Sequence, residues 1–125
     1  IAAIAPLAII DDASHDIPPG DISAASWALG AYWRMYPPGT VHVAVVDPGV
    51  GSDRRALVCE LDGRFVVAPD NGLITHALHV ATERRMFAME PSRPFPGEPR
   101  DHDHRPASVS ATFHGRDIFA PAAAG

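Results

Sequence analysis

The protein has 125 residues, the size of one domain, and its 46% hydrophobic and 20% charged residues predict a globular fold with a real core. A formal net charge of −5 argues against nucleic acid or an anionic membrane as the main partner. All ten basic residues are Arg, which excludes chemistry based on a Schiff-base lysine or a phosphate-loop lysine. The single cysteine, Cys59, excludes an intrachain disulfide and is expected to be a small buried residue.

The apolar N-terminus does not predict a targeting or membrane segment. No basic residue precedes residues 1–10, and Asp11 and Asp12 follow them without a small-residue cleavage pattern, so a signal peptide is not expected. No stretch reaches the roughly 18 apolar residues of a membrane span. We therefore expect a cytoplasmic protein without a membrane partner, in which residues 7–10 form a buried strand.

The middle of the chain alternates helix and strand patterns. Asp21 is expected to cap a helix over residues 22–36, which Pro37, Pro38 and Gly39 end. The β-branched residues 41–46 predict a strand buried on both faces, typical of a parallel sheet, with a tight loop over 47–51. Together with the elements that follow, this alternation predicts an α/β fold, a layered sheet with flanking helices.

The later elements are predicted mainly from turn residues. Asp62 and Gly63 are a strong hairpin signal between strands over 56–61 and 64–68. Asp70 or Asn71 is expected to cap a helix that runs to about residue 80. The remaining expectations are a strand over 85–89, a proline-rich loop over 90–106, and a helix opening over 118–124 with Pro121 in its first turn.

Three polar clusters are candidates for chemistry, and each has a plain alternative. Residues 47–55 follow a buried strand, where open α/β sheets place ligands, but the loop could equally be a simple turn. Residues 68–73 could hold a ligand through the Asn71 amide or be only a helix cap. Residues 112–117 carry His114, a candidate general base, or form a surface loop with a solvated ion pair.

The other histidines give weaker signals. His102 and His104 can share one side of an extended chain and converge on a metal, but the surrounding prolines and charges favour a solvated loop. We therefore predict no metal site. His76 and His79 lie three residues apart on one predicted helix and are expected to be partly buried helix residues.

Taken together, four motifs are far more specific than any one cluster. They comprise His15 with residues 19–21, then residues 38–51, 68–73 and 110–121. In order and spacing they resemble the S-adenosyl-L-methionine (SAM) hydroxide adenosyltransferase family, or SAM hydrolases, which are related to the SAM-dependent fluorinase and chlorinase. The resemblance covers nearly the whole chain. It implies the N-terminal domain of that fold, SAM as the substrate, no cofactor, and a homotrimer for the intact protein.

The resemblance also implies a reaction, in which water or hydroxide attacks C5′ of the ribose of SAM and releases adenosine and L-methionine. The residues at the family's catalytic positions are Asp47, Arg54 and His114, which would balance charge, hold the anionic nucleophile and help to take its proton. The residues at its substrate-binding positions are Pro48, Gly49, Asn71, Gly115 and Arg116.

The same positions separate the subfamilies. The fluorinase has a Tyr-Pro-Ala-Thr-Gly-like loop where this chain has Asp47 to Gly51, and a Tyr-Ser pair where it has His114 and Gly115. Hydroxide is therefore favoured over halide as the nucleophile. The alternatives are a halide-using SAM adenosyltransferase and a fragment that binds adenosine or SAM without turnover.

Two family features have no match in the sequence. These are the first strand with its Thr-Asp-Phe-Gly-like motif and the C-terminal β domain with its Asp-x-Phe-Gly-Asn motif. Residues 1–125 are therefore expected to be a partial N-terminal domain that lacks groups the family uses to bind SAM. An exposed sheet edge or core face would make such a piece prone to self-association.

Overall fold

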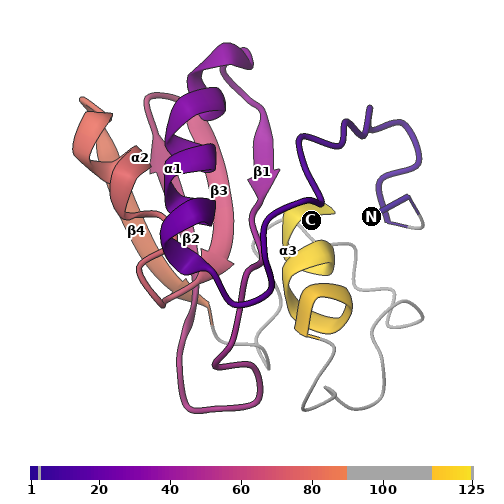
Figure 1. Ribbon diagram of the computed structural model, residues 1–125. Coiled ribbons are helices and arrows are strands. Elements are labelled where there is room, and N and C mark those ends of the chain that lie inside the picture. Colours follow the sequence, from indigo (N-terminus) through magenta and orange to yellow (C-terminus); the bar gives the residue numbers. More distant parts are fainter. Residues whose placement is uncertain (3, 90–113, 125) are drawn as a thin grey trace.

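The computed structural model describes residues 1–2, 4–89 and 114–124 (Figure 1). Its elements are α1 (Ile22–Tyr32), the 3₁₀ turn η1 (Trp33–Met35), β1 (Val41–Val43), β2 (Ala56–Leu61), β3 (Arg64–Pro69), α2 (Thr75–Val80), β4 (Arg84–Met89), the π-helical turn η3 (Gly115–Phe119) and α3 (Ala120–Ala124). The predicted loop over 90–106 and the two histidines within it lie outside the described residues.

The four strands form one mixed sheet in the order β1-β3-β2-β4. β1 runs parallel to β3, as the sequence predicted, whereas β2 is antiparallel to both β3 and β4. Helices α1 and α2 pack against one face of the sheet, and η3 and α3 pack against the other (Figure 1). The predicted fold class, a layered α/β sheet with flanking helices, is confirmed.

Each face of the sheet has its own apolar cluster. The larger cluster joins the sheet to α1 and α2, with Trp33 and Leu29 facing Cys59 and Val66. The smaller one places Phe119 and Ile118 against Ala56, Val67 and Met89. The second cluster matters for the site, because it fixes the turn that follows His114 onto the sheet.

Helix α1 begins where its capping residue predicts. The Asp21 carboxylate accepts a hydrogen bond from the Ala24 backbone N–H at 2.9 Å, which satisfies one of the free donors at the helix start. The helix predicted over 22–36 is therefore confirmed, although its final turn tightens into the 3₁₀ turn η1.

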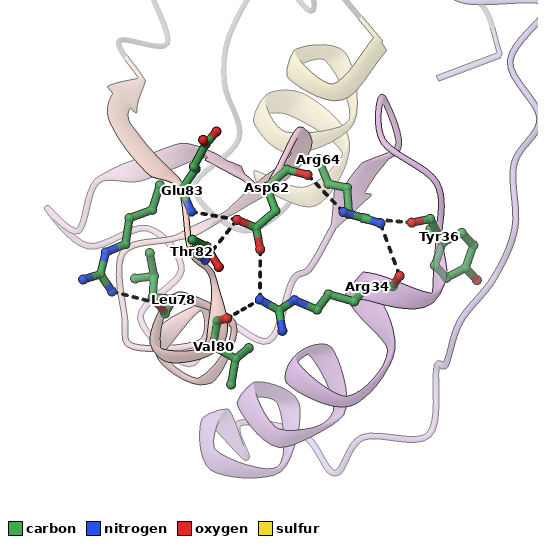
Figure 2. A network of polar contacts seen from close by, with 9 residues as sticks. Arg34, Tyr36, Asp62, Arg64, Leu78, Val80, Thr82 and Glu83 are labelled. Atoms are coloured by element: carbon green, nitrogen blue, oxygen red, sulfur yellow. Dashed lines mark hydrogen bonds and ion pairs between the residues drawn. The ribbon is translucent and has the colours of Figure 1, made fainter.

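The β2–β3 hairpin is also confirmed, with Asp62 and Gly63 at positive φ (46° and 76°) as a tight two-residue turn requires. Figure 2 shows the Asp62 carboxylate at the centre of a polar network. It accepts hydrogen bonds from the backbone N–H groups of Glu83 and Thr82, at 2.7 and 2.9 Å, and from the Arg34 guanidinium at 2.9 Å. The bond from Glu83, followed by that from Arg34, holds the pKa of Asp62 below its ordinary value.

Arginine side chains extend this network to the ends of the helices (Figure 2). Arg34 also donates to the Val80 carbonyl at the end of α2. Arg64 donates to the carbonyls of Tyr36 and Asp62, at 2.6 and 3.0 Å. Because most of these bonds end on backbone atoms, the network has a structural role and fixes the hairpin turn to α1 and α2.

The strand predicted over residues 7–10 is wrong. This segment has no regular structure, and the side chains of Leu7 and Ile9 are 96% and 98% exposed. A strand needs a neighbour to pair its backbone groups. Within the described residues, β3 is the sole partner of β1, and the other edge of β1 has no strand beside it.

The strand predicted over residues 41–46 is shorter and less buried than expected. β1 ends at Val43, and only the side chains on its inner face are buried, namely His42 and the following Ala44, which pack under α1. Val41, Val43 and Val45 point to the opposite side and are 37–40% exposed. The β-branched run is therefore an edge strand in the described sheet rather than a central one.

The helix expected from Asp70 or Asn71 begins later, at Thr75, without a side-chain cap. Asn71 uses its side-chain oxygen to accept from the Leu73 N–H at 3.1 Å, and Gly72 has a φ of 93°, so the chain turns before the helix starts. The predicted strand near 85–89 is confirmed as β4. The helix expected over 118–124 is present as α3, but it continues directly from η3, so Pro121 does not lie in the first turn of the helical segment.

Candidate active site

The candidate site lies where the chain leaves β1 and returns into β2. Asp47 opens this loop and Arg54 closes it, two residues before β2 begins. Inside the loop the Ser52 N–H and hydroxyl both bond to the Gly49 carbonyl, at 3.0 and 2.5 Å. These local bonds fold the loop back, so its two ends meet.

Asp47 and Arg54 form a buried ion pair at that meeting point. The Arg54 Nε–H donates to Asp47 Oδ1 at 2.9 Å, and Arg54 Nη2 donates to Asp47 Oδ2. Their side chains are only 10% (Arg54) and 4% (Asp47) exposed. A bidentate pair removed from water in this way fixes both side chains and leaves neither charge uncompensated.

His114 joins this pair from the far end of the chain. Its Nδ1 lies 2.9 Å from Arg54 Nη2. A guanidinium can only donate, so Nδ1 must be the accepting nitrogen and a neutral ring carries its proton on Nε2. The three residues that the resemblance assigned to catalysis, 47, 54 and 114, therefore form one connected cluster.

The residues that border this cluster include two glycines, Gly20 and Gly49, and Pro48. A Cβ at Gly49 would lie 3.8 Å from Asp47 Oδ1 and 3.3 Å from the Ser52 hydroxyl. A Cβ on Gly20, which has a φ of 76°, would contact Pro48 at 3.7 Å. The predicted residues Pro48 and Gly49 thus border the carboxylate, and Gly49 keeps the loop close to it.

Asn71 lies beside the cluster but is bonded to the protein. Its Nδ2 donates to the Val46 carbonyl at 2.9 Å, immediately before Asp47. With its bond to Leu73, this side chain joins the end of β3 to the chain beyond β1. Asn71 therefore holds the backbone that presents Asp47.

The remaining predicted site residues belong to η3. Gly115 approaches the chain just after β1, because a Cβ there would lie 4.0 Å from the Val45 side chain. The Arg116 side chain lies outside what the structure describes. One residue that the sequence reasoning missed is Phe119, whose ring centroid lies 5.4 Å from the Arg54 guanidinium carbon. Phe119 lies within the fourth motif, residues 110–121, but nothing in that pattern singles it out as a site residue.

Two other shifted titratable groups belong to the core. Burial raises the pKa of the Cys59 thiol to about 11, so the predicted buried cysteine is confirmed and is not a nucleophile at neutral pH. Burial also lowers the pKa of His42, which packs against the Tyr36 ring at 5.2 Å. On α2, His76 is partly buried, as expected, while His79 is exposed.

The structure also limits what the described residues can enclose. A cavity of about 180 Å³ lies between residues 14–17, α1 and the end of β1, and Asp47, Arg54 and His114 do not line it. Ligand pockets are usually about 300–1,000 Å³, so this cavity is too small for a nucleoside conjugate. In the described ranges no three His, Cys, Asp or Glu side chains could hold a metal, and no helix is long and apolar enough to cross a membrane.

Comparison with known proteins gives one consistent family. Residues 1–125 match the family described as the SAM hydroxide adenosyltransferase N-terminal domain. Over 124 residues, 99% of this chain, it is 46% identical to an (R)-S-adenosyl-L-methionine hydrolase of Thermus thermophilus and 44% identical to one of Salinispora arenicola. The chain covers 47% and 44% of these relatives, about half their length.

Solved structures agree with the fold. A crystal structure of an uncharacterized conserved protein from Thermotoga maritima superposes with a TM-score of 0.84 at 35% identity, covering 98% of this chain and 44% of that one. The crystal structure of a conserved hypothetical protein from Thermus thermophilus gives a TM-score of 0.70 at 38% identity, covering 98% of this chain and 43% of that one.

Proposed function

Because the chain belongs to the SAM hydroxide adenosyltransferase family, we propose that it forms part of an enzyme that hydrolyses SAM to adenosine and L-methionine. The observation that carries the proposal is the buried cluster of Asp47, Arg54 and His114. The curated relatives named (R)-S-adenosyl-L-methionine hydrolase support the substrate. Pro48, Gly49, Asn71, Gly115 and Arg116 are proposed to bind that substrate.

The reaction needs a nucleophile more than it needs an activated leaving group. The water oxygen forms a bond to C5′, the C5′–S bond breaks, and its electron pair goes to sulfur, which leaves as the neutral thioether of methionine. One water proton is released. Because the sulfonium already leaves readily, the proposal includes no cofactor, and the protein must make, desolvate and aim the hydroxide.

The cluster suggests how the proton moves. We assign charge balance to Asp47, contact with the nucleophile oxygen to Arg54, and proton acceptance to His114. In a ring protonated at Nε2, only Nδ1 can take a proton, and Nδ1 faces Arg54 Nη2. Arg54 Nη2 would therefore turn from Nδ1 to the new hydroxide as Nδ1 receives the water proton.

The cluster also favours water over halide. A halide ion has no proton to lose, so it does not need a histidine positioned beside an Asp–Arg pair. Incubating the full-length gene product with SAM and chloride separates the two reactions. Adenosine with methionine supports hydrolysis, and 5′-chloro-5′-deoxyadenosine would show a halide-using enzyme. Calorimetric binding of SAM or adenosine without either product would show a binding protein.

His114→Ala tests the assigned residue. We expect hydrolysis to slow by about 100-fold or more, the usual size of an acid–base contribution. The matched control is His79→Ala, which removes an exposed histidine on α2 and should leave the rate unchanged. Equal rates in both variants would contradict the role of His114.

Two finer statements complete the proposal. The intact protein is proposed to be a homotrimer, as the resemblance implies, and to be cytoplasmic. Sedimentation of the full-length gene product tests the trimer. A monodisperse monomer would contradict the trimer.

A further inference from the structure

The Arg54 guanidinium, which donates to Asp47 and to His114, also lies over the Phe119 ring. The Arg54 guanidinium carbon lies 5.4 Å from the ring centroid, within the range of a cation–π interaction. The Phe119 side chain is fully buried, and the Arg54 side chain is 10% exposed. Such contacts are stronger where water is excluded. The same cation therefore has three neighbours, of which Phe119 is the apolar one.

The π-helical turn η3 explains how His114 and Phe119 reach one guanidinium. The Ala120 N–H bonds to the Gly115 carbonyl, five residues back, as in a π-helix. An α-helix advances about 100° per residue, so residues five apart would point roughly 140° apart. The wider turn instead brings His114 and Phe119 to the same side. π-Helical turns often occur at functional sites.

The sheet fixes the position of the Phe119 ring. It packs in the smaller apolar cluster with Ala56, Val67 and Met89, which come from β2, β3 and β4. Arg54 precedes Ala56 by two residues, so the ring and the guanidinium are held against the same part of β2. Any rotation that moves the guanidinium away from Asp47 would also move it off the Phe119 ring.

We propose that Phe119 is a positioning residue that holds Arg54 in register with Asp47 and His114. The inference rests on the proposed role of Arg54 in SAM hydrolysis, but its structural part can be measured separately. Phe119 touches no reacting atom in this account; it acts through the guanidinium. It would narrow the orientations that Arg54 samples as its Nη2 hydrogen bond passes from His114 to the nucleophile.

Three variants of the full-length gene product separate positioning from packing. Phe119→Leu removes the aromatic face and keeps an apolar side chain, whereas Phe119→Tyr keeps the ring. Ile118→Ala is the matched control, because Ile118 is in the same apolar cluster and the aromatic contact to Arg54 comes from Phe119. If Phe119→Leu does not fold, Phe119→Met provides a second ring-free variant with a flexible, space-filling side chain.

The main readout is ¹⁵N NMR of arginine and histidine side chains. In the wild type we expect a slowly exchanging Arg54 Nε–H and a His114 ring protonated at Nε2. Phe119→Leu should speed Arg54 Nε–H exchange by about tenfold or more and mix the two His114 tautomers. Phe119→Tyr and Ile118→Ala should keep both signals, even where they lower the melting temperature.

Kinetics give the second readout. We expect Phe119→Leu to lower kcat for SAM hydrolysis about tenfold with KM within about twofold, and Phe119→Tyr to recover most of kcat. Unchanged NMR signals in a folded ring-free variant would overturn the positioning role, as would equal effects in Ile118→Ala. If the wild type does not hydrolyse SAM, the proposed function fails, while the NMR signals still decide whether Phe119 orders Arg54.

Discussion

Two Asp–Arg pairs lie at opposite ends of β2 and have different surroundings. At the hairpin end, Asp62 and Arg34 are 21% and 47% exposed, and their other bonds go to the backbone N–H groups of Thr82 and Glu83 and to the Val80 carbonyl. At the loop end, Asp47 and Arg54 are almost fully buried, and the additional partner of Arg54 is the side chain of His114.

The comparison shows why an ion pair alone does not identify a site. The Asp62 pair forms hydrogen bonds with main-chain groups of neighbouring segments, so its role is to hold those segments together. Among the described residues, the loop-end pair of Asp47 and Arg54 bonds to side chains and not to the main chain. Its side-chain bonds therefore connect the three residues 47, 54 and 114 to one another. Whether the further hydrogen bonds of an Asp–Arg pair go to the main chain or to a histidine side chain is what distinguishes a structural pair from a candidate catalytic cluster.

The largest expected difference is in stability. Arg54→Met would leave Asp47 buried without its partner and should lower the free energy of unfolding by about 3 kcal/mol or more. Arg34→Met, the matched control, removes the same cation from a pair that water can solvate, and its loss should be smaller. Urea denaturation of both variants measures the difference. Equal losses would mean that burial does not distinguish the two pairs.

A smaller effect is expected at Asn71, which holds the backbone before Asp47. Asn71→Ala removes the bonds to Val46 and Leu73 and should cost about 1–2 kcal/mol in urea denaturation. Asn71→Asp keeps the oxygen that accepts from Leu73 but turns a second acceptor toward the Val46 carbonyl, so it should not recover the stability lost in Asn71→Ala. If Asn71→Ala is as stable as the wild type, this link does not hold the loop.

The smallest expected effect is the pH dependence of stability that comes from Asp62 at the hairpin end of β2. Its native pKa is lowered, chiefly by the Glu83 N–H bond, while an unfolded Asp has a pKa of about 3.9. Its contribution to stability is therefore complete above about pH 4 and is lost as the pH falls through the lower native pKa. The stability advantage of the wild type over Asp62→Asn should shrink in denaturation curves below about pH 4. A difference that does not change with pH would contradict this linkage.

Local signals predicted the elements whose causes are local. The Asp21 cap and the Asp62–Gly63 turn need only neighbouring residues, and both were predicted correctly. The strand over 7–10 was predicted wrongly, because its pattern is apolar but pairing depends on a neighbouring strand. The late start of α2 was missed because Asn71 bonds to Val46, 25 residues away, and not to the helix.

The candidate site was predictable only in part. Asp47 and His114 are 67 positions apart, and no periodicity in the sequence indicates that they approach. The family resemblance brought them together, and the hydrogen bonds to Arg54 agree with it. Phe119 was missed because a phenylalanine in an apolar run suggests core packing, and the π-helical turn that directs it toward Arg54 has no simple sequence signature.

The most direct test of the central claim is hydrolysis of SAM in H₂¹⁸O by the full-length gene product. If a water activated at Asp47, Arg54 and His114 attacks C5′, the adenosine formed will carry one ¹⁸O at its 5′ oxygen, and methionine will carry none. Adenosine without ¹⁸O, or SAM that binds and remains intact, would contradict the account.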